Sequence, residues 1–384
     1  MTRPARAIAT ALALLLSTTA AHALDTSARA ALVIDHDTGT VLLSKNADTP
    51  MPPASMSKLM TLYMLFEALQ DGRLALDDTF RVSERAWRMG GSKMFVNVGD
   101  EITVENLIRG IIIHSGNDAC VVVAEGLAGS EEAFSQRMTV RARELGMLDS
   151  VFANSTGWPH PDHRMSARDL VTLATLLIRE FPQYYPYFAE TEFTWEGITQ
   201  SNRNPLLGLG IGADGLKTGH TQEAGYGLVA SGERDGRRVT LMVTGLDSEQ
   251  ARLTETERLM NWAFREFAVQ ELYGPDVPIT NARVWLGAER EVPLVSKTGI
   301  TAIVPWAAQN DIRAWVEYQG PLEAPVAAGQ TVAELVLAVP EIGETRYPLQ
   351  AMAPVPEAGF LRKVEAAATI LFDKARTAAI GGDS

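Results

Sequence analysis

Ser55-Met56-Ser57-Lys58 is the stretch around which this sequence of 384 residues is organised. It follows two prolines and opens an apolar run at residues 59–65 that favours a helix. Positions i and i+3 share a helix face, so Ser55 and Lys58 are expected to lie within hydrogen-bonding reach. A serine becomes a strong nucleophile when a base takes its proton, and a buried lysine can be that base. By itself the pattern also fits a helix cap followed by an exposed lysine.

Two further motifs follow, Ser115-Gly116-Asn117 about 60 residues later and Lys217-Thr218-Gly219 about 100 residues beyond it. In this order the three motifs resemble the active-site set of the penicillin-recognising serine enzymes, although class A β-lactamases have Ser-Asp-Asn in the middle. Residues 214–221 resemble the low-molecular-mass class C penicillin-binding proteins, which are serine-type D-alanyl-D-alanine carboxypeptidases. The resemblance runs from about Ala30 to the C-terminus and includes the order of the domains.

The resemblance implies an α+β fold. This fold begins with a β-lactamase/transpeptidase-like catalytic domain, in which helices flank an antiparallel sheet and a helical insertion separates its early and late strands. A small all-β domain follows. It also implies a serine D-Ala-D-Ala carboxypeptidase that removes the terminal D-alanine from peptidoglycan stem pentapeptides through an acyl-enzyme. β-Lactam antibiotics are then expected to be inhibitors, and no cofactor is required.

The catalytic candidates are Ser55, Lys58 and Ser115. We expect Ser55 to attack the substrate carbonyl and Lys58 to accept its proton. Ser115 is expected to carry a proton to the leaving D-alanine, because a hydroxyl can donate and accept at the same time. These roles make the sequence a candidate for covalent catalysis without a metal.

Three of the candidate substrate-binding residues are assigned from their chemistry. The amide of Asn117 can bond both Lys58 and the substrate amide. The charge of Lys217 suits an anionic substrate end and is expected to keep Lys58 neutral. Thr218 can donate its hydroxyl to the terminal carboxylate.

Three more binding candidates complete the set. Gly219 is expected to leave the strand edge open, so that the substrate can lie along it as an extra strand. By resemblance, the backbone N–H groups of Ser55 and His220 form the oxyanion hole. Arg252 and Arg203 resemble, by their distance from the third motif, arginines placed near the substrate carboxylate. A surface or helix ion pair is the alternative for each arginine.

Composition limits the other interpretations. With 46% hydrophobic residues, the chain is long enough for two domains with sizeable cores. The formal net charge of −13 argues against a nucleic-acid surface. The single cysteine, Cys120, excludes an internal disulfide and is predicted to fill core volume. We predict a loop rather than a metal site at His160-Pro161-Asp162-His163, because no third ligand cluster follows.

The spacing of apolar residues alternates between strand-like and helix-like segments. Apolar runs on either side of Asp37-Thr38-Gly39 predict a hairpin, and runs on either side of Asp235-Gly236 predict another. Periodicity alone supports an α+β class, with a helical section between early and late strands. The segments with helical spacing are 107–113, 131–145, 166–178 and 248–267.

The domain boundaries are predicted from a targeting signal and from prolines that interrupt helices and strands. Two early arginines, an apolar core and the small-x-small site Ala21-His22-Ala23 predict a signal peptide. Prolines 275 and 278 mark the end of the catalytic domain, and prolines 354 and 356 mark a linker. The predicted segments are 1–23 for the signal peptide, 24–272 for the penicillin-binding, transpeptidase-like domain, 273–353 for the small β domain, and 354–384 for a linker with an amphipathic helix.

A second Lys-Thr-Gly occurs at Lys297-Thr298-Gly299. Short apolar runs surround it, which predicts a hairpin with a glycine turn. It lacks the His-Thr that follows the first copy, so we assign it no catalytic role.

The last segment predicts the location of the protein. Residues 360–376 carry an apolar stripe with basic flanks, which suits the surface of an anionic membrane and is too polar to span one. A helix packed on the β domain is the alternative. With the signal peptide, this predicts an exported, periplasmic protein attached peripherally to the outer face of the inner membrane.

Three other functions are weighed against the carboxypeptidase. A β-lactamase usually needs a glutamate in the loop after the middle motif, and residues 154–169 contain none. A D-alanyl endopeptidase that cuts cross-links shares the same motifs and stays open. A non-catalytic wall-binding scaffold is least compatible with the intact motifs.

Overall fold

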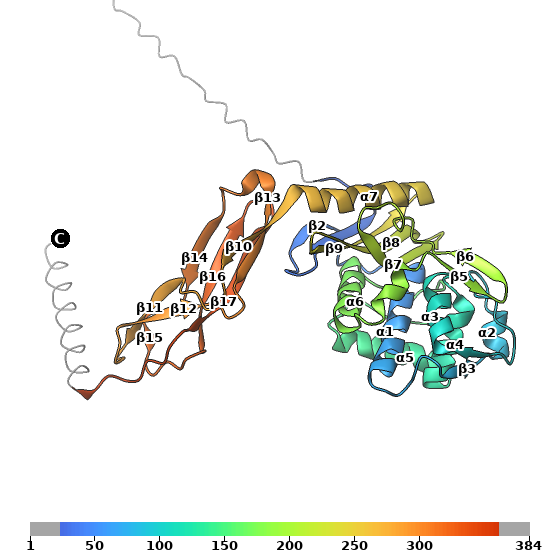
Figure 1. Ribbon diagram of the computed structural model, residues 1–384, viewed down its shortest axis with the longest axis horizontal. Coiled ribbons are helices and arrows are strands. Elements are labelled where there is room, and N and C mark those ends of the chain that lie inside the picture. Colours follow the sequence, from blue (N-terminus) through green and yellow to red (C-terminus); the bar gives the residue numbers. More distant parts are fainter. Residues whose placement is uncertain (1–23, 361–384) are drawn as a thin grey trace, which may run out of the picture.

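The computed structural model describes residues 24–360, so the predicted signal peptide and most of the predicted terminal helix lie outside the described residues. Within this range the chain forms a part with helices around a sheet, followed by an elongated all-β part (Figure 1). This arrangement confirms the predicted fold class.

One antiparallel sheet is built from the beginning and the end of the first part, in the order β2-β1-β9-β8-β7. The two predicted hairpins supply β1 with β2 and β8 with β9, and Asp235-Gly236 forms the turn of the second. Because β7 stands at the end of this order, the third motif lies on an edge strand. The strands are β1 (Ala30–Asp35), β2 (Val41–Lys45), β7 (Ala213–Thr221), β8 (Gly225–Arg234) and β9 (Arg237–Leu246).

Both faces of this sheet are buried, which explains why its strands are apolar on both sides. Alternate side chains of a strand point to opposite faces. Leu32 of β1 packs into the cluster that contains the helical insertion, whereas Val33 packs into the cluster that contains Leu259 and Met260 of α7. The sheet is therefore sandwiched between the insertion and α7 (Figure 1).

The helical insertion begins directly after β2 and carries the first two motifs. Five helices of this part, α2, α3, α5, α6 and α7, begin after a Ser or Thr whose side chain accepts a backbone N–H of the first turn. Helix α4 escaped prediction because its first eight residues are all buried and show no amphipathic spacing. The helices are η1 (Ala54–Ser57), α1 (Lys58–Gln70), α2 (Glu84–Arg88), α3 (Val104–Ile112), α4 (Asn117–Ala128), α5 (Glu131–Glu144), α6 (Ala167–Glu180), η2 (Tyr185–Ala189) and α7 (Glu249–Glu266). Two small hairpins pair β3 (Thr79–Arg81) with β4 (Glu101–Thr103), and β5 (Glu192–Trp195) with β6 (Ile198–Ser201).

The all-β part contains a two-stranded sheet, β10-β13, and a six-stranded sheet in the order β14-β16-β17-β12-β11-β15. Only the short β11·β15 pair among its named strands is parallel. Its elements are β10 (Phe267–Tyr273), β11 (Thr280–Trp285), β12 (Glu291–Val295), β13 (Ile300–Pro305), η3 (Trp306–Ala308), β14 (Arg313–Glu317), β15 (Leu322–Glu323), β16 (Thr331–Val339) and β17 (Gly343–Ala351).

The hairpin predicted at the second Lys-Thr-Gly is wrong. The strands on its two sides do not pair with each other, because β12 pairs with β11 and β17 whereas β13 pairs with β10. Gly299 has a positive φ of 74°, and a Cβ there would lie 2.9 Å from the carbonyl oxygen of Tyr273. The glycine therefore turns a tight corner between two sheets, which a sequence pattern cannot distinguish from a hairpin.

The pairing of β10 with β13 bears on the boundary between the two parts. Since β10 starts at Phe267 and belongs to the β pairing, we propose that the second domain begins there rather than at residue 273. The backbone hydrogen bonds after residue 353 bear on the second predicted boundary. Val355 exchanges two backbone hydrogen bonds with Val326, and the N–H of Ala358 donates to Leu286, so we propose that this domain extends to Ala358. Within residues 24–360, no helix has the length and apolar character needed to cross a membrane.

Candidate active site

Ser55 and Lys58 meet as the sequence predicts. Ser55 lies in the single turn η1, and Lys58 is the first residue of α1, the central helix of the insertion. The side chain of Lys58 points back along the helix, and its Nζ lies 2.8 Å from Oγ of Ser55. The alternative of an exposed lysine is excluded, because Lys58 is fully buried.

The surroundings of Lys58 suit a base. Its Nζ donates to Oδ1 of Asn117 at 2.7 Å and to the backbone carbonyl of Thr156 at 2.5 Å. Burial lowers the pKa of Lys58 to about 8, and the charge of Arg203 adds to the lowering. Burial is the main cause for both buried lysines, and for Lys217 the charge of Lys58 is the second cause.

The second motif forms a strained turn at the start of α4. Ser115 has a positive φ of 58°, and its buried Oγ accepts a hydrogen bond of 2.9 Å from Nζ of Lys217. A Cβ on Gly116 would lie 2.8 Å from Oδ1 of Asp118, so the glycine permits the close approach. Asn117 fixes its amide by donating from Nδ2 to the carbonyl of Gly90 at 2.8 Å. The first and third motifs are thereby joined through the second.

Asp118 is a structural residue of the site that the sequence analysis missed. Its buried carboxylate accepts the backbone N–H groups of Met94 at 2.8 Å and Phe95 at 2.9 Å. These bonds hold the loop of residues 90–96 against α4. The sequence does carry a signal for this role. Asp118 stands directly before a wholly apolar run, and a carboxylate that is buried with such a run needs hydrogen-bond donors around it.

The third motif lies along β7 and faces η1. Gly219 also has a packing role, and its expected role toward the substrate stays a prediction. A Cβ there would lie 3.0 Å from Cγ of Met56 and from the carbonyl of Pro53, so the glycine lets β7 approach η1. His220 is exposed and stacks on Tyr226, with ring centroids 3.8 Å apart. The oxyanion hole predicted from the N–H groups at Ser55 and His220 stays a prediction.

The three motifs border one cavity of about 310 Å³. Two arginines are among the residues that line it. Arg252 of α7 is buried with its guanidinium 5.8 Å from the ring centre of Tyr226, and Nη1 of Arg203 lies 2.6 Å from Oγ of Ser92. The cavity is lined by Ser55, Ser92, Ser115, Arg203, Thr218, Gly219, His220, Glu249 and Arg252.

Among the described residues, Nε of Arg252 is buried and has no hydrogen-bond partner. Because Arg252 also lines the cavity, its guanidinium can meet an anionic ligand there. With Arg203 and the buried Lys217, the cavity concentrates positive charge in a protein with a net charge of −13. This arrangement suits a nucleophile beside a carboxylate site.

Residues 17–248 match the family model of D-alanyl-D-alanine carboxypeptidases, which covers more than half of the chain. The chain belongs to this family. Residues 267–357 match a second model, the C-terminal domain of penicillin-binding protein 5. The family resemblance of the three motifs is thereby confirmed.

Relatives of the D-alanyl-D-alanine carboxypeptidase family match almost the whole chain. D-alanyl-D-alanine carboxypeptidase DacC of Escherichia coli is 36% identical over 345 residues, which cover 88% of this chain and 86% of that protein. The crystal structure of penicillin-binding protein 5 from Haemophilus influenzae has a TM-score of 0.79 and 32% identity, and covers 87% of this chain and 99% of that one. Penicillin-binding protein D2 of Listeria monocytogenes in its ampicillin-bound form has a TM-score of 0.58 and 31% identity, and covers 63% of this chain and 99% of that one.

The remaining candidates lie apart from the carboxypeptidase cavity or inside the core. Cys120 is fully buried, as predicted, and burial raises the pKa of its thiol to about 12. His160 and His163 lie in a loop, and within residues 24–360 no group of three or more ligand side chains is arranged to hold a metal ion. Lys297 is exposed and pairs with Asp276 at 2.7 Å. That the second Lys-Thr-Gly has no catalytic role stays a prediction.

Proposed function

We propose that the protein is a serine-type D-Ala-D-Ala carboxypeptidase that removes the terminal D-alanine from peptidoglycan stem pentapeptides and is inhibited by β-lactams. The observation that carries the proposal is the buried Lys58, with Nζ 2.8 Å from Oγ of Ser55 and a pKa that burial lowers to about 8. Such a lysine is neutral often enough near neutral pH to remove a proton. Membership of the carboxypeptidase family supports the substrate class.

In the acylation step, Oγ of Ser55 attacks the carbonyl carbon between the two D-alanines, and its proton passes to Lys58. A neutral lysine has one lone pair and two N–H groups. The lone pair can face Ser55 while the two N–H groups keep their bonds to Asn117 and the Thr156 carbonyl. Three fixed neighbours thus orient the base. The charge that develops on the carbonyl oxygen is met by the backbone N–H groups of Ser55 and His220.

The C–N bond then breaks. The leaving amine takes the proton from Lys58 through Ser115, whose hydroxyl is oriented by Lys217. The remaining peptide stays on Ser55 as an ester. Water attacks this ester while Lys58 accepts a proton, and that proton returns to Oγ of Ser55 as the shortened peptide leaves. The net reaction is hydrolysis of one amide bond, with the enzyme restored.

The cavity supports the choice of a peptide with a free carboxyl end. Arg203 and Arg252 supply positive charge and Thr218 supplies a hydroxyl in the lining of the cavity, and the buried Lys217 precedes Thr218 in β7. A terminal carboxylate placed there sets the amide carbonyl over Ser55. A substrate with a blocked carboxyl end loses these contacts, so it is expected to react slowly.

The proposal is tested with a labelled penicillin and a pentapeptide that ends in D-Ala-D-Ala. Mass spectrometry is expected to place the penicillin adduct on the peptide that contains Ser55, and the pentapeptide is expected to lose one D-alanine. A Ser55→Ala variant should do neither. Label on another serine would refute the assignment of the nucleophile, and a protein that neither binds penicillin nor cleaves the peptide would be the non-catalytic scaffold.

Penicillin and stem peptides also distinguish the carboxypeptidase from two other activities on the same fold. A β-lactamase would turn over many penicillin molecules for each enzyme molecule, whereas a carboxypeptidase is expected to retain the adduct. The loop at residues 154–169 carries no glutamate, which favours the carboxypeptidase. A D-alanyl endopeptidase would release monomers from a cross-linked peptide dimer at a rate comparable with pentapeptide trimming.

For the location, we propose export to the periplasm and peripheral attachment to the outer face of the inner membrane. The support is the basic and apolar N-terminal sequence and the amphipathic pattern after residue 358, both largely outside the described residues. Fractionation of the full-length protein beside a version truncated after Ala358 tests the attachment. Two soluble proteins, or two proteins that both sediment with membranes, would contradict it.

A further inference from the structure

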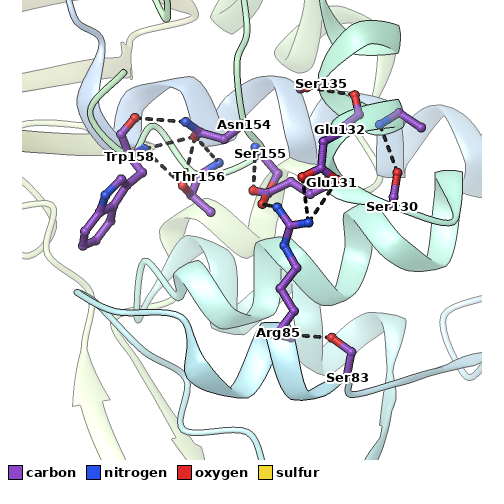
Figure 2. A network of polar contacts seen from close by, with 12 residues as sticks. Ser83, Arg85, Ser130, Glu131, Glu132, Ser135, Asn154, Ser155, Thr156 and Trp158 are labelled. Carbon is purple, nitrogen blue, oxygen red and sulfur yellow. Dashed lines mark hydrogen bonds and ion pairs between the residues drawn. The ribbon is translucent and has the colours of Figure 1, made fainter. Parts of the chain in front are cut away.

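The carbonyl of Thr156, one of the three acceptors around Lys58, belongs to a segment with no helix or strand. Asn117 is held by the start of α4, but residues 154–158 form a turn whose position depends on side-chain contacts. Oδ1 of Asn154 accepts the backbone N–H groups of Thr156, Gly157 and Trp158 at 3.1, 2.8 and 3.1 Å (Figure 2). These bonds close the turn on itself but do not attach it to the rest of the domain.

Glu131 attaches the turn. It is the first residue of α5, and its side chain is only 7% exposed. Oε1 accepts both the N–H of Ser155 at 3.1 Å and its hydroxyl at 2.8 Å, while Oε2 pairs with Arg85 at 2.8 Å (Figure 2). The start of a helix also favours a negative charge. Both carboxylate oxygens therefore have partners: Oε1 bonds to the turn and Oε2 to Arg85.

Ser155 is held from the other side by the catalytic helix. Its carbonyl accepts the hydroxyl of Thr61 at 2.7 Å, and Thr61 lies three residues after Lys58 on α1. The peptide unit that leads to Thr156 is thus clamped between α5 and α1. The direction of the Thr156 carbonyl, and with it one bond to the base, follows from this clamp.

We propose that Glu131 is a positioning residue for the base: it holds Ser155 so that the Thr156 carbonyl orients Lys58 toward Ser55. The inference rests on the proposed function of Lys58. Glu131 acts through two residues and does not contact the reacting atoms, so it differs from the glutamate expected in a β-lactamase loop. Its negative charge also favours the protonated form of the lysine.

The other titratable groups that act on Lys58 come from α4 and from the β7 side of the site. Asp118 and, when ionised, Cys120 favour the protonated lysine, whereas Arg203 opposes it. The charge of Lys58 in turn lowers the pKa of Lys217 by repulsion, after the larger effect of burial. None of these groups changes when Glu131 is replaced, so a change in the pH profile of a variant reports on the turn and on the lost carboxylate.

Glu131→Ala removes both acceptors, and the rate of acylation by penicillin is expected to fall by about 100-fold, the effect typical of a displacement of about 1 Å at a catalytic group. Glu131→Gln keeps one oxygen for Ser155 and should lose only about 10-fold or less, which corresponds to about 1.4 kcal/mol. Because Gln carries no charge, the acid limb of its rate profile is expected to move to lower pH. The loss of the charge is enough to produce that shift, whereas a purely structural role would leave the plateau rate per acylatable molecule unchanged.

Glu132→Ala is the matched control. Glu132 is the next residue of α5 and also pairs with Arg85, at 2.7 Å, but its side chain is 65% exposed. This variant is expected to match the wild type in rate and pH profile. Thermal unfolding of all three variants and titration of acylatable enzyme give the fraction of folded protein in each sample.

The outcomes separate the inference from the function on which it rests. If the wild type is not acylated at Ser55, the proposed function fails. If the wild type is acylated and both Glu131 variants match it in rate and profile, the positioning role is refuted. If Glu131→Ala yields less acylatable protein that reacts at the wild-type rate, the residue serves stability alone and the inference is also refuted. If Glu131→Ala does not fold, Glu131→Gln decides.

Discussion

A Lys58→Met substitution is expected to change how the free energy of unfolding depends on pH. The ordinary pKa of a lysine is 10.5, whereas burial lowers the pKa of Lys58 to about 8 in the folded protein. Between these pH values the unfolded chain binds one more proton than the folded chain, so folding becomes more favourable as the pH rises. This contribution is complete above pH 10.5 and is lost as the pH falls to about 8.

The size of the effect follows from the two pKa values. The difference between 10.5 and about 8, at about 1.4 kcal/mol for each pH unit, corresponds to about 3 kcal/mol. Methionine has a similar length and does not titrate, so the variant lacks this rise. It also removes a charge that lowers the pKa of Lys217, and the smaller shift there acts in the same direction. The acceptors left without a donor destabilise the variant nearly equally at every pH.

Urea unfolding of the wild type and the variant, followed by tryptophan fluorescence at about pH 7 and about pH 10, measures this difference. The wild type is expected to gain about 2 to 3 kcal/mol relative to Lys58→Met between the two conditions, because part of the contribution appears only above pH 10. If the two proteins change in parallel, the folded pKa of Lys58 is the ordinary one. That result would refute the argument that burial prepares this lysine to act as a base.

Three further predictions concern other residues of the site and the core. Lys217→Ala should lower penicillin acylation by about 100-fold or more, as expected for the loss of one buried charge-stabilising group, while Lys297→Ala stays near wild type; equal losses would mean that the second motif is functional. Gly157→Ala should lower the unfolding free energy by more than about 2 kcal/mol in denaturant titration, because φ is 79° and the new Cβ would meet a backbone carbonyl of η1 at 1.9 Å. Gly146→Ala, with φ of 84° and open space, should cost only about 1 kcal/mol, and a similar loss in both would remove the clash from the explanation. Cys120 should not react with a thiol reagent until the protein is unfolded, and rapid labelling of native protein would contradict its burial.

The local features of the fold could be predicted because each depends on residues close together in sequence. The first hairpin follows from a turn between apolar runs, and the contact between Ser55 and Lys58 follows from helical spacing. The three motifs could be joined only through the family resemblance. Nothing in the sequence shows that Lys217 reaches Ser115, which lies 102 positions earlier.

The features that escaped prediction depend on contacts between distant segments. Gly219 is a glycine because η1 passes beside β7, and the partner atoms belong to Pro53 and Met56. Glu131 looks like an ordinary acidic residue in the first turn of a helix, where the helix dipole alone would explain it. Its bond to Ser155 becomes visible only when the first residue of α5 is seen to lie beside the turn (Figure 2). Which sheet each strand after Tyr273 joins also depends on contacts between distant segments, so the sequence did not predict it.

The two buried lysines connect substrate recognition with catalysis. Burial and mutual repulsion make it unfavourable for Lys58 and Lys217 to be charged together. If the substrate carboxylate lies near Lys217, as the proposed function requires, it would stabilise the charged form of Lys217, and the remaining repulsion would favour the neutral form of Lys58. The neutral form is the one that can take the proton from Ser55. In the proposed mechanism a carboxyl end in the cavity would therefore do more than hold the peptide, because it would place the charge on Lys217 and leave Lys58 free to act as the base.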